Sequence, residues 1–229
     1  MNAYRRFRYS HAMADWVDQL RGGFVVFDGP DGSGKSTQFR RFMEHVESSG
    51  VPVCQVREPG GTPIGERIRD VLLDPEHDGM DLRCEMLLYM ASRAQLVAHR
   101  IAPAQDAGEL VLADRFISST LAYQGAAGGI PVADILRVGQ IALGKYWPDL
   151  VVVFDVDEQT AAARLSPLLD RMEQKGADYH RLVRQGFLDQ AQSDPQRYLV
   201  IDARGDADEV FDELCDAIAR RFAESGDHS

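Results

Sequence analysis

Residues 29–37, GPDGSGKST, combine residue types and a spacing that bind phosphate. Gly29 is followed, after four residues, by Gly34, Lys35 and Ser36. This is the spacing of a P-loop, in which glycines let backbone N–H groups approach the phosphates, a lysine contacts the outer phosphates and a hydroxyl binds Mg²⁺. The spacing predicts a nucleoside triphosphate site in which Lys35 is catalytic and Ser36 is a metal ligand. The predicted ATP-binding residues are Gly29, Pro30, Asp31, Gly32, Ser33, Gly34, Lys35, Ser36 and Thr37.

The segments on either side of this loop have the patterns that a P-loop requires. Residues 23–29 (GFVVFDG) are a short apolar run that ends in glycine, which predicts a buried strand. Residues 36–48 are expected to form a helix that ends at the sequence SSG, residues 48–50. A strand that leads through a glycine-rich turn into a helix directs N–H groups and the positive end of the helix dipole at one place. This arrangement favours a bound anion.

A second candidate site follows another buried strand, at residues 111–116 (VLADRF). In a parallel α/β sheet, an acidic residue at the carboxyl end of a strand faces the phosphate loop. Asp114 is therefore predicted to hold Mg²⁺ through water, and Arg115 to bind a phosphate with its forked guanidinium. An aspartate followed by an arginine is more often a surface ion pair, so these two residues need further support.

Strands and helices alternate along the rest of the chain, which predicts a doubly wound parallel sheet. Thr62 and Pro63 have the residue types of a helix cap and a first helical position. Residues 84–108 predict one long helix with a kink near Pro103, and residues 166–178 break the apolar period and predict a mobile segment. Further strands are expected at 51–56, 109–114, 148–156 and 197–203, and further helices at 62–73, 131–144, from 158, 179–193 and 207–225.

Composition restricts the partners. The 229 residues carry a net charge of −11, and 45% of them are hydrophobic. A nucleic-acid partner is not expected, because such proteins need a basic face. No apolar run is long enough for a membrane helix, and no secretory signal is present. The three cysteines form no CxxC or zinc spacing, which favours reduced thiols and a cytoplasmic protein.

Residues 1–22 are predicted to be a flexible N-terminal extension, because a basic segment (YRRFRYSH) precedes a mixed one. Three interpretations remain open. The segment is a disordered tail or a short docking helix, or translation begins at Met13, or the Arg-rich stretch is a transit peptide, although its serine content is low for that.

From Gly23 to Arg221 the sequence resembles the thymidylate kinase family of P-loop nucleoside monophosphate kinases, which transfer the γ-phosphate of ATP to dTMP. The resemblance rests on segments that occur in the family's order: FDGPDGSGKST, REPGGTPIGERIRDVLL, EMLLYMASRAQ, VLADRFISSTLAYQG, PDLVVVFDV, DRMEQ and VIDA. It implies a three-layer P-loop NTPase fold of the α/β class, with a five-stranded parallel sheet, helices on both faces and a short lid. The domain would cover residues 23–224, with the lid at about 165–177.

The resemblance also assigns roles by position. Arg69 and Arg115 match the arginines that hold the dTMP phosphate, and Tyr89 matches the aromatic residue that stacks on thymine. Asp31, counted among the catalytic residues, matches an acidic residue near the acceptor sugar and the metal. Arg93 and Gln124 match residues that read the edge of the base, and Thr120 matches a residue near the base. Tyr123 matches the tyrosine that crowds the 2′ position of the sugar and so favours deoxyribose. Glu58 matches a glutamate near the metal and the acceptor.

The lid departs from the family pattern. Members whose loop lacks an arginine, as here with Gly32, carry several lid arginines, whereas this lid is shorter and less basic. Arg171 is the predicted catalytic arginine, and Arg164 is assigned to the preceding helix. Ser118 stands where an aspartate is frequent.

The resemblance implies dTMP and ATP as substrates, Mg²⁺ as the metal, dTDP made for dTTP synthesis, and a homodimer. Two alternatives remain open: a kinase for another pyrimidine deoxynucleotide such as dUMP, and a P-loop protein that binds nucleotide without catalysis. Phosphoryl transfer needs positioning and charge neutralisation, so no general base is expected.

Overall fold

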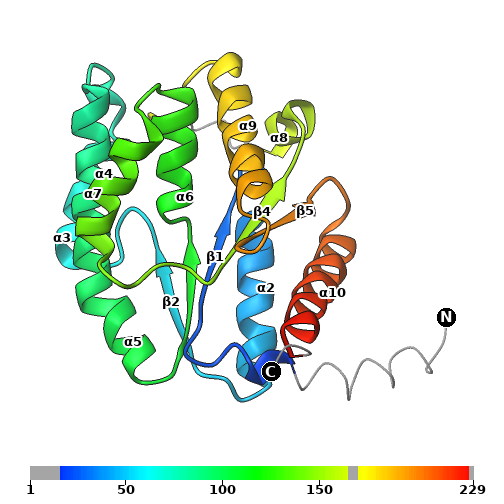
Figure 1. Cartoon of the computed structure of the whole chain (residues 1–229). Coiled ribbons are helices and arrows are strands. Elements are labelled where there is room, and N and C mark those ends of the chain that lie inside the picture. Colours follow the sequence, from blue (N-terminus) through cyan, green and yellow to red (C-terminus); the bar gives the residue numbers. More distant parts are fainter. Residues whose placement is uncertain (1–15, 165–169, 227–229) are drawn as a thin grey trace.

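The computed structural model describes residues 16–164 and 170–226, and its centre is a five-stranded sheet in the order β2-β3-β1-β4-β5 (Figure 1). Every neighbouring pair of these strands is parallel. The strands are Phe24–Asp28 (β1), Val53–Arg57 (β2), Leu110–Asp114 (β3), Leu150–Asp155 (β4) and Tyr198–Asp202 (β5). The predicted α/β fold, with one parallel sheet between two helical layers, is confirmed.

The helices lie between successive strands or close the chain. The longer ones are Lys35–Ser48 (α2), Pro63–Leu73 (α3), Leu82–Leu96 (α4), Val132–Leu143 (α7), Ala177–Ser193 (α9) and Ala207–Gly226 (α10). The short ones are Pro75–His77 (η1), Ala102–Asp106 (α5), Ile117–Thr120 (α6), Glu158–Arg164 (α8) and the two π-helical segments Val97–Ile101 (η2) and Leu121–Ala127 (η3).

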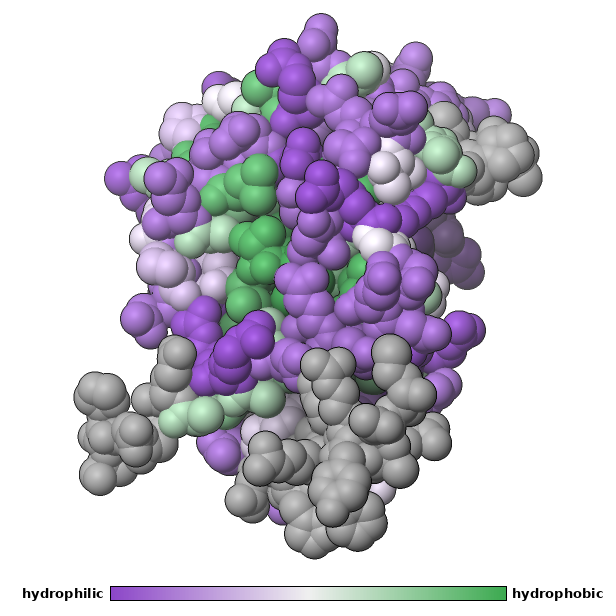
Figure 2. Space-filling view, turned by 90° about the vertical axis from the view of Figure 1, so that its right-hand side faces the viewer, coloured by the Kyte–Doolittle hydropathy of each residue, from purple (hydrophilic) through white to green (hydrophobic). Residues whose placement is uncertain are grey.

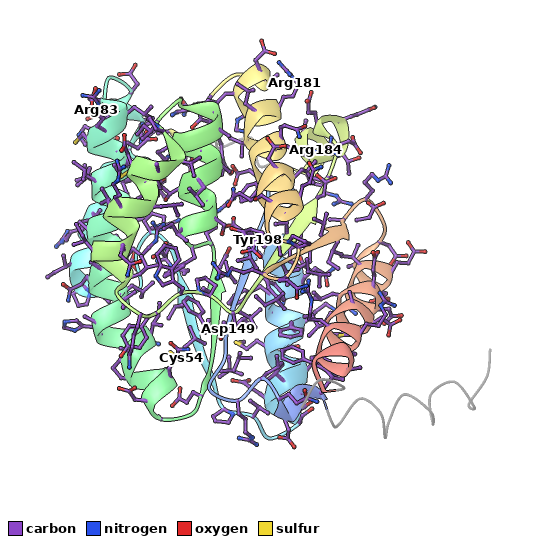
Figure 3. All side chains as sticks on the ribbon, in the orientation of Figure 1. Cys54, Arg83, Asp149, Arg181, Arg184 and Tyr198 are labelled. Carbon is purple, nitrogen blue, oxygen red and sulfur yellow. The ribbon has the colours of Figure 1, made fainter. Side chains whose placement is uncertain are left out.

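Both faces of the sheet are buried, which explains the continuous apolar runs of its strands. In β1, Phe24 and Val26 belong to the core under α4, η3 and α9, whereas Val25 and Phe27 belong to the core under α2 and α10. Asp149 ties β4 to β1, because its carboxylate accepts a hydrogen bond of 2.8 Å from the N–H of Phe24 (Figure 3). The sheet therefore holds the carboxyl ends of β1, β3 and β4 in fixed register.

The edge of the sheet at β5 is less covered than its centre. Val200 on this strand is 40% exposed. Figure 2, which views the molecule from the side of β5 and α10, shows a strip of hydrophobic side chains bordered by hydrophilic ones. Among the described residues no strand pairs with the outer side of β5.

The start of the domain differs from the prediction. Residues 1–22 were expected to form a flexible extension, but Trp16, Val17 and Leu20 are buried in the core under α2 and α10. The indole of Trp16 stacks on Phe42, with ring centroids 6.2 Å apart. The packed domain thus already includes residues 16–22, because an apolar W-V-x-x-L pattern lies within that mixed segment. The alternatives for residues 1–15 concern residues outside those described.

One helical prediction is confirmed and one helical segment was missed. The long helix predicted at 84–108 is present as an unbroken helical run from Leu82 to Asp106, in which the π-helical turn Val97–Ile101 lies between α4 and α5, just before Pro103. Residues 117–127 form helical turns that we had not predicted, and these turns carry the candidate residues Thr120, Tyr123 and Gln124. The cap at Thr62 is confirmed, since its hydroxyl accepts a 3.0 Å hydrogen bond from the N–H of Gly65.

Candidate active site

The phosphate loop joins β1 to α2, and the N–H groups of Gly29, Ser33 and Thr37 are bonded within it. Gly34 is the N-cap of α2, with φ 79°, and makes no side-chain cap hydrogen bond. Gly32, with φ 76°, packs so closely on α8 that a Cβ atom there would lie 2.4 Å from the carbonyl oxygen of Ala161. A left-handed glycine cap leaves the first amides of the helix without partners, which suits an anion.

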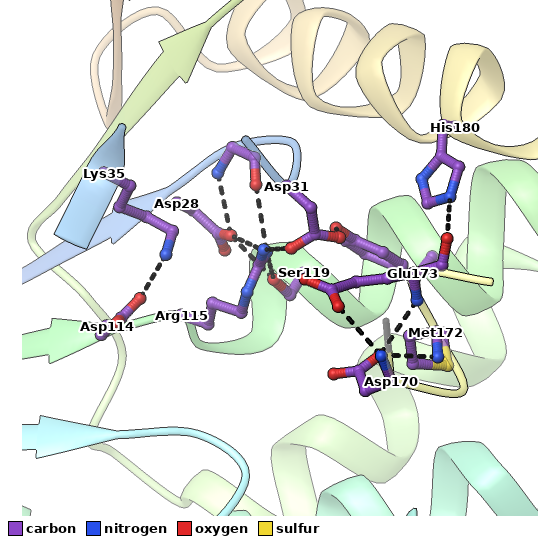
Figure 4. A network of polar contacts seen from close by, with 12 residues as sticks. Asp28, Asp31, Lys35, Asp114, Arg115, Ser119, Asp170, Met172, Glu173 and His180 are labelled. Atoms are coloured by element: carbon purple, nitrogen blue, oxygen red, sulfur yellow. Dashed lines mark hydrogen bonds and ion pairs between the residues drawn. The ribbon is translucent and has the colours of Figure 1, made fainter. Parts of the chain in front are cut away.

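Lys35 and Asp114 meet at the centre of the site. The Nζ of Lys35 lies 2.5 Å from Oδ1 of Asp114, across the carboxyl ends of β1 and β3 (Figure 4). The hydroxyl of Ser36 and the carboxylate of Asp114 are hard oxygen donors of the kind that Mg²⁺ prefers, and Mg²⁺ sites often use one or two protein ligands together with phosphates and water. These two residues fit that role. Among residues 16–164 and 170–226, no cluster of three or more His, Cys, Asp or Glu side chains suits a metal held by protein alone.

Arg115 joins the phosphate loop to β3. Its backbone is left-handed, with φ 68°, a costly conformation for a residue with a side chain. Its Nη1 donates to Gly29 O and to Ser119 Oγ, each at 3.0 Å, and to Asp28 Oδ1 at 3.2 Å (Figure 4). Its Nη2 donates to Asp31 Oδ1. These contacts hold the guanidinium over the loop and stabilise the strained backbone.

Asp31 is the carboxylate of the loop, and Tyr123 is its second partner. The hydroxyl of Tyr123 donates to Asp31 Oδ2 at 2.7 Å. Burial opposes ionisation of Asp31, but the charge of Arg115, the hydrogen bond from Tyr123 and the charge of Lys35 outweigh it and lower the pKa of this carboxyl. Asp31 is therefore a carboxylate at neutral pH, held by Tyr123 of η3 on one side and by Arg115, which follows β3, on the other.

A cavity of about 230 Å³ lies beside these residues, and its walls contain most of the predicted acceptor residues. It lies between the carboxyl end of the sheet, α3, α4 and the segment after α6. The predicted residues that line it are Asp31, Lys35, Glu58, Arg69, Tyr89, Arg93, Asp114, Arg115, Thr120, Tyr123 and Gln124. Residues far apart in the sequence are thus brought to one place.

Glu58 and Arg93 form a buried ion pair in the wall of this cavity. Arg93 Nε donates to Glu58 Oε2 at 2.7 Å, and Nη2 donates to Thr120 Oγ1 at 3.1 Å. Burial raises the pKa of Glu58 to about 7, although Arg93 partly offsets this effect. Arg69 is held separately, because its Nη1 donates to the carbonyl of Pro59 at 2.9 Å. Burial also raises the pKa of Tyr89, so its phenol stays neutral.

Arg171 does not reach the phosphate loop, contrary to our prediction for the catalytic arginine. Its Nε donates to the carbonyl of Leu72 at 2.7 Å, and its Nη2 lies 2.7 Å from Oε2 of Glu85 in an ion pair. It lines neither the acceptor cavity nor the hollow at the loop. The buried carboxylate of Glu85 on α4 holds this side chain in its present position. Residues 165–169 of the predicted lid lie outside those described.

A wider hollow of about 530 Å³ borders the loop on its other side. Eight of the nine predicted ATP-binding residues, 30–37, line it, and Gly29 does not. Arg164 also lines this hollow, and its Nη1 donates to the carbonyl of Ala203 at 2.8 Å. Arg164 is the last residue of α8, which agrees with its assignment to the helix before the lid, and it also lies next to the loop.

Several site residues were missed by the sequence analysis. Asp28 is fully buried and accepts hydrogen bonds of 2.7 Å from both Ser118 and Ser119. Glu85 is hidden behind Gln124, and Glu173 borders both hollows, where burial raises the pKa of its carboxyl. The sequence did offer a signal for Asp28, Ser118 and Ser119. Asp28 directly precedes Gly29 of the loop motif, and the two serines closely follow Asp114 and Arg115. Glu85 and Glu173 gave no separate signal.

Comparison with known proteins shows the family of this chain. The family model for thymidylate kinase matches residues 27–214. The chain is 42% identical over 208 residues to a thymidylate kinase of Symbiobacterium thermophilum, which covers 89% of this chain and 97% of that protein. It is 44% identical over 205 residues to one of Deinococcus radiodurans, covering 88% and 98%. The crystal structure of thymidylate kinase from Ehrlichia chaffeensis matches with a TM-score of 0.69 and 30% identity, over 85% of this chain and 97% of that one.

The parallel sheet, the loop between β1 and α2 and the adjoining cavity define a nucleotide-binding P-loop kinase. The chain belongs to the thymidylate kinase family, as its sequence motifs predicted.

Proposed function

We propose that this protein uses ATP and Mg²⁺ to phosphorylate dTMP, yielding dTDP for dTTP synthesis. The observation that carries the proposal is the single cavity that joins the predicted acceptor residues to Lys35 and Asp114. Such a cavity brings a nucleoside monophosphate next to the outer phosphate of a nucleotide bound on the loop. Family membership identifies thymine as the base.

The acceptor is proposed to lie with its phosphate at Arg69 and Arg115 and its base against Tyr89. Two guanidinium groups bind a phosphate through paired, charge-assisted hydrogen bonds. Tyr123 closes the sugar side, where its ring and its bond to Asp31 leave little room for a 2′-hydroxyl. Gln124, Arg93 and Thr120 also line the cavity, and we assign them to the base.

In the proposed reaction, an oxygen of the dTMP phosphate attacks the γ-phosphorus of ATP, and the bond from that phosphorus to the β–γ bridging oxygen breaks, releasing ADP. The backbone of residues 29–37 and Lys35 hold the donor phosphates, while Arg115 keeps the acceptor in line. Bound Mg²⁺ would neutralise charge on the transferred group, held by Ser36 and by Asp114 through water. Positioning and charge carry the rate, so no side chain needs to act as a base.

The lid-side cation at the donor phosphates is proposed to be Arg164. It lines the loop hollow and its side chain is already directed toward the segment 203–205. Its guanidinium would add positive charge where ATP binds, a role that the position of Arg171 does not support.

We further propose a cytoplasmic homodimer. Helices α3, α4 and α7 pack side by side and expose large apolar side chains, among them Ile64, Leu87 and Ile141, the last of which is 86% exposed. Such a face suits a second copy of the chain. Cys54, Cys84 and Cys215 are all free, as expected in a reducing compartment. Within the described parts, no helix has both the length and the apolar character needed to cross a bilayer.

The decisive experiment is an ADP-release assay with ATP, Mg²⁺ and each of dTMP, dUMP, UMP, dCMP, AMP and GMP. We expect a clear preference for dTMP. A preference for dUMP would leave the proposed mechanism unchanged and identify dUMP as the acceptor. If none of the acceptors increased ADP release, a nucleotide-binding protein without catalysis would be favoured. No feature of the described residues favours either alternative.

A further inference from the structure

Glu85 on α4 is a buried carboxylate to which the proposed reaction gives no role. It is 1% exposed, and it does not line the acceptor cavity. Its Oε1 accepts a hydrogen bond of 2.8 Å from Nε2 of Gln124, which does line the cavity. Its Oε2 lies 2.7 Å from Nη2 of Arg171 and 3.7 Å from Nζ of Lys175. One carboxylate therefore connects the base end of the cavity to two cations of the segment before α9.

We propose that Glu85 is a positioning residue that fixes which end of the Gln124 carboxamide faces the substrate base. This inference rests on the proposed placement of the dTMP base at Gln124. An ionised carboxylate can only accept hydrogen bonds, so the NH₂ group of Gln124 must face it. The carbonyl oxygen of the amide lies on the opposite side from the NH₂ group, away from Glu85. Because Gln124 lines the cavity and Glu85 stands behind it, that oxygen is presented to the ligand.

The two cations occupy the other oxygen of Glu85. Arg171 and Lys175 can only donate, and both lie against Oε2 of Glu85. Both oxygens of Glu85 therefore face donors, which suits the orientation in which Gln124 donates through its NH₂ group. Arg171 is itself anchored, because its Nε donates to the carbonyl of Leu72 at the end of α3. The segment that we expected to supply a catalytic arginine thus supplies the counter-charge for a base-reading residue.

The consequence is a choice between classes of pyrimidine. Thymine and uracil carry a hydrogen on N3 and can donate it to a carbonyl oxygen. Cytosine has a bare N3, whose lone pair would face the lone pairs of that oxygen. The arrangement favours keto-pyrimidine nucleotides over dCMP and does not separate dTMP from dUMP.

The test measures kcat/KM for dTMP and for dCMP in the wild type, Glu85→Gln, Gln124→Met and the double variant. A glutamine at 85 can donate to the carbonyl of Gln124 and let the amide turn over. We expect the dTMP-to-dCMP ratio of Glu85→Gln to fall at least about tenfold, mainly through the KM for dTMP, as for a lost hydrogen bond in a buried site. The KM for ATP should not change. Exposed Glu76→Gln on η1 is the matched control and should keep the wild-type ratio.

The double variant separates an effect through Gln124 from general damage. Two residues that act as one unit are not additive, so Glu85→Gln should change the ratio little once Gln124 is methionine. If Glu85→Gln keeps the wild-type ratio, or lowers it equally in both backgrounds, the inference is wrong.

Removing one charge from a buried pair can prevent folding. The variant Glu85→Gln/Arg171→Met removes both partners, and it should fold, show ATP-dependent thermal stabilisation and retain the lowered ratio. A wild-type ratio in that variant would overturn the inference. If the proposed placement of the base at Gln124 is wrong, the results are distinguishable from these. Gln124→Met alone would then keep the wild-type ratio, or the wild type would not prefer dTMP over dCMP. Either result would also overturn the inference about Glu85.

Discussion

The proposed donor hollow and the proposed acceptor cavity meet at Lys35 and differ in their linings: a glycine-rich loop forms much of the first, whereas charged residues from several elements form most of the second. The donor hollow is wide, at about 530 Å³, and consists largely of the loop 30–37 and the segment 203–207. The acceptor cavity is less than half that volume, about 230 Å³, and its walls hold Glu58 and Arg93 already paired. In the proposed function, the first side binds through the backbone amides of the loop and the second through specific side chains.

This difference indicates where selectivity arises. Backbone amides and a lysine recognise a chain of phosphates but read little of the attached base. In the proposed acceptor cavity several polar groups, among them those of Glu58, Arg93 and Arg115, are held by neighbours before any ligand binds. A ligand that cannot pair with the remaining polar groups would leave a buried group unpaired. Such a site rejects wrong ligands more strongly than it attracts right ones.

The largest effect is expected from Lys35→Met, at the boundary between the two regions. The change removes the ammonium that pairs with Asp114 and would contact the transferred phosphate. We expect kcat to fall about 1000-fold, as for loss of a group that stabilises transition-state charge, with a small change in the KM for dTMP. Exposed Lys145→Met is the control. If Lys35→Met kept a tenth of the activity, the loop would not be the donor site.

Arg115→Lys tests the acceptor side. A lysine keeps the charge but cannot make the forked contacts to Asp31, Gly29 and Asp28. We expect kcat/KM for dTMP to fall about 100-fold, as when a charge-assisted hydrogen bond is lost in a buried site, while the KM for ATP stays near that of the wild type. Arg181→Lys, on the exposed face of α9 (Figure 3), should be neutral. An equal rise in both KM values would contradict the separation of the two regions.

The two lid-side arginines allow a direct comparison. Arg164→Ala should raise the KM for ATP about fivefold, as for loss of about 1 kcal/mol of ion pairing, with little change in stability. Arg171→Ala should lower the free energy of unfolding by about 2 kcal/mol, because Glu85 would keep only the more distant Lys175. Urea titration and ATP saturation curves measure the two effects. A 100-fold lower kcat in Arg171→Ala, without loss of stability, would return the catalytic role to that residue.

These residues show what the sequence could predict. The loop 29–37 and the pair Asp114–Arg115 were accessible because their chemistry depends on short spacings next to recognisable strands. Their meeting in space follows from parallel strand order, since the carboxyl ends of β1 and β3 are neighbours. The family resemblance supplied the long-range members of the cavity.

The direction of a side chain was not accessible in the same way. Arg171 has the residue type and position of a catalytic lid arginine, yet its guanidinium turns to Glu85, 86 residues earlier in the sequence. Trp16 lies in a segment whose composition predicts an extension, but its ring fits against Phe42. In both cases a contact with a residue distant in the sequence determines where the side chain lies, and the local sequence pattern does not reveal that contact.

The smallest effect on turnover is expected from Glu58→Gln, which tests the stability of the acceptor wall rather than its chemistry. In the folded protein burial raises the pKa of Glu58 to about 7, above its ordinary value of 4.5. Below pH 4.5 both folded and unfolded chains carry the proton. As the pH rises from 4.5 to 7, the unfolded chain loses this proton first, so the folded state loses stability relative to it until the pH passes the folded pKa.

Glutamine does not titrate, so the stability of the variant lacks the pH-dependent contribution of Glu58. We expect the free energy of unfolding of the wild type, minus that of Glu58→Gln, to fall as the pH rises from 4.5 to 7, by at most about 1.4 kcal/mol per pH unit for one proton, and to level off above. Urea denaturation of both proteins across this range measures it, and the contributions of other carboxylates and histidines cancel in the difference. A difference that rises with pH would mean that Arg93 outweighs burial and holds Glu58 ionised, and the acceptor wall would then contain a full ion pair throughout this pH range.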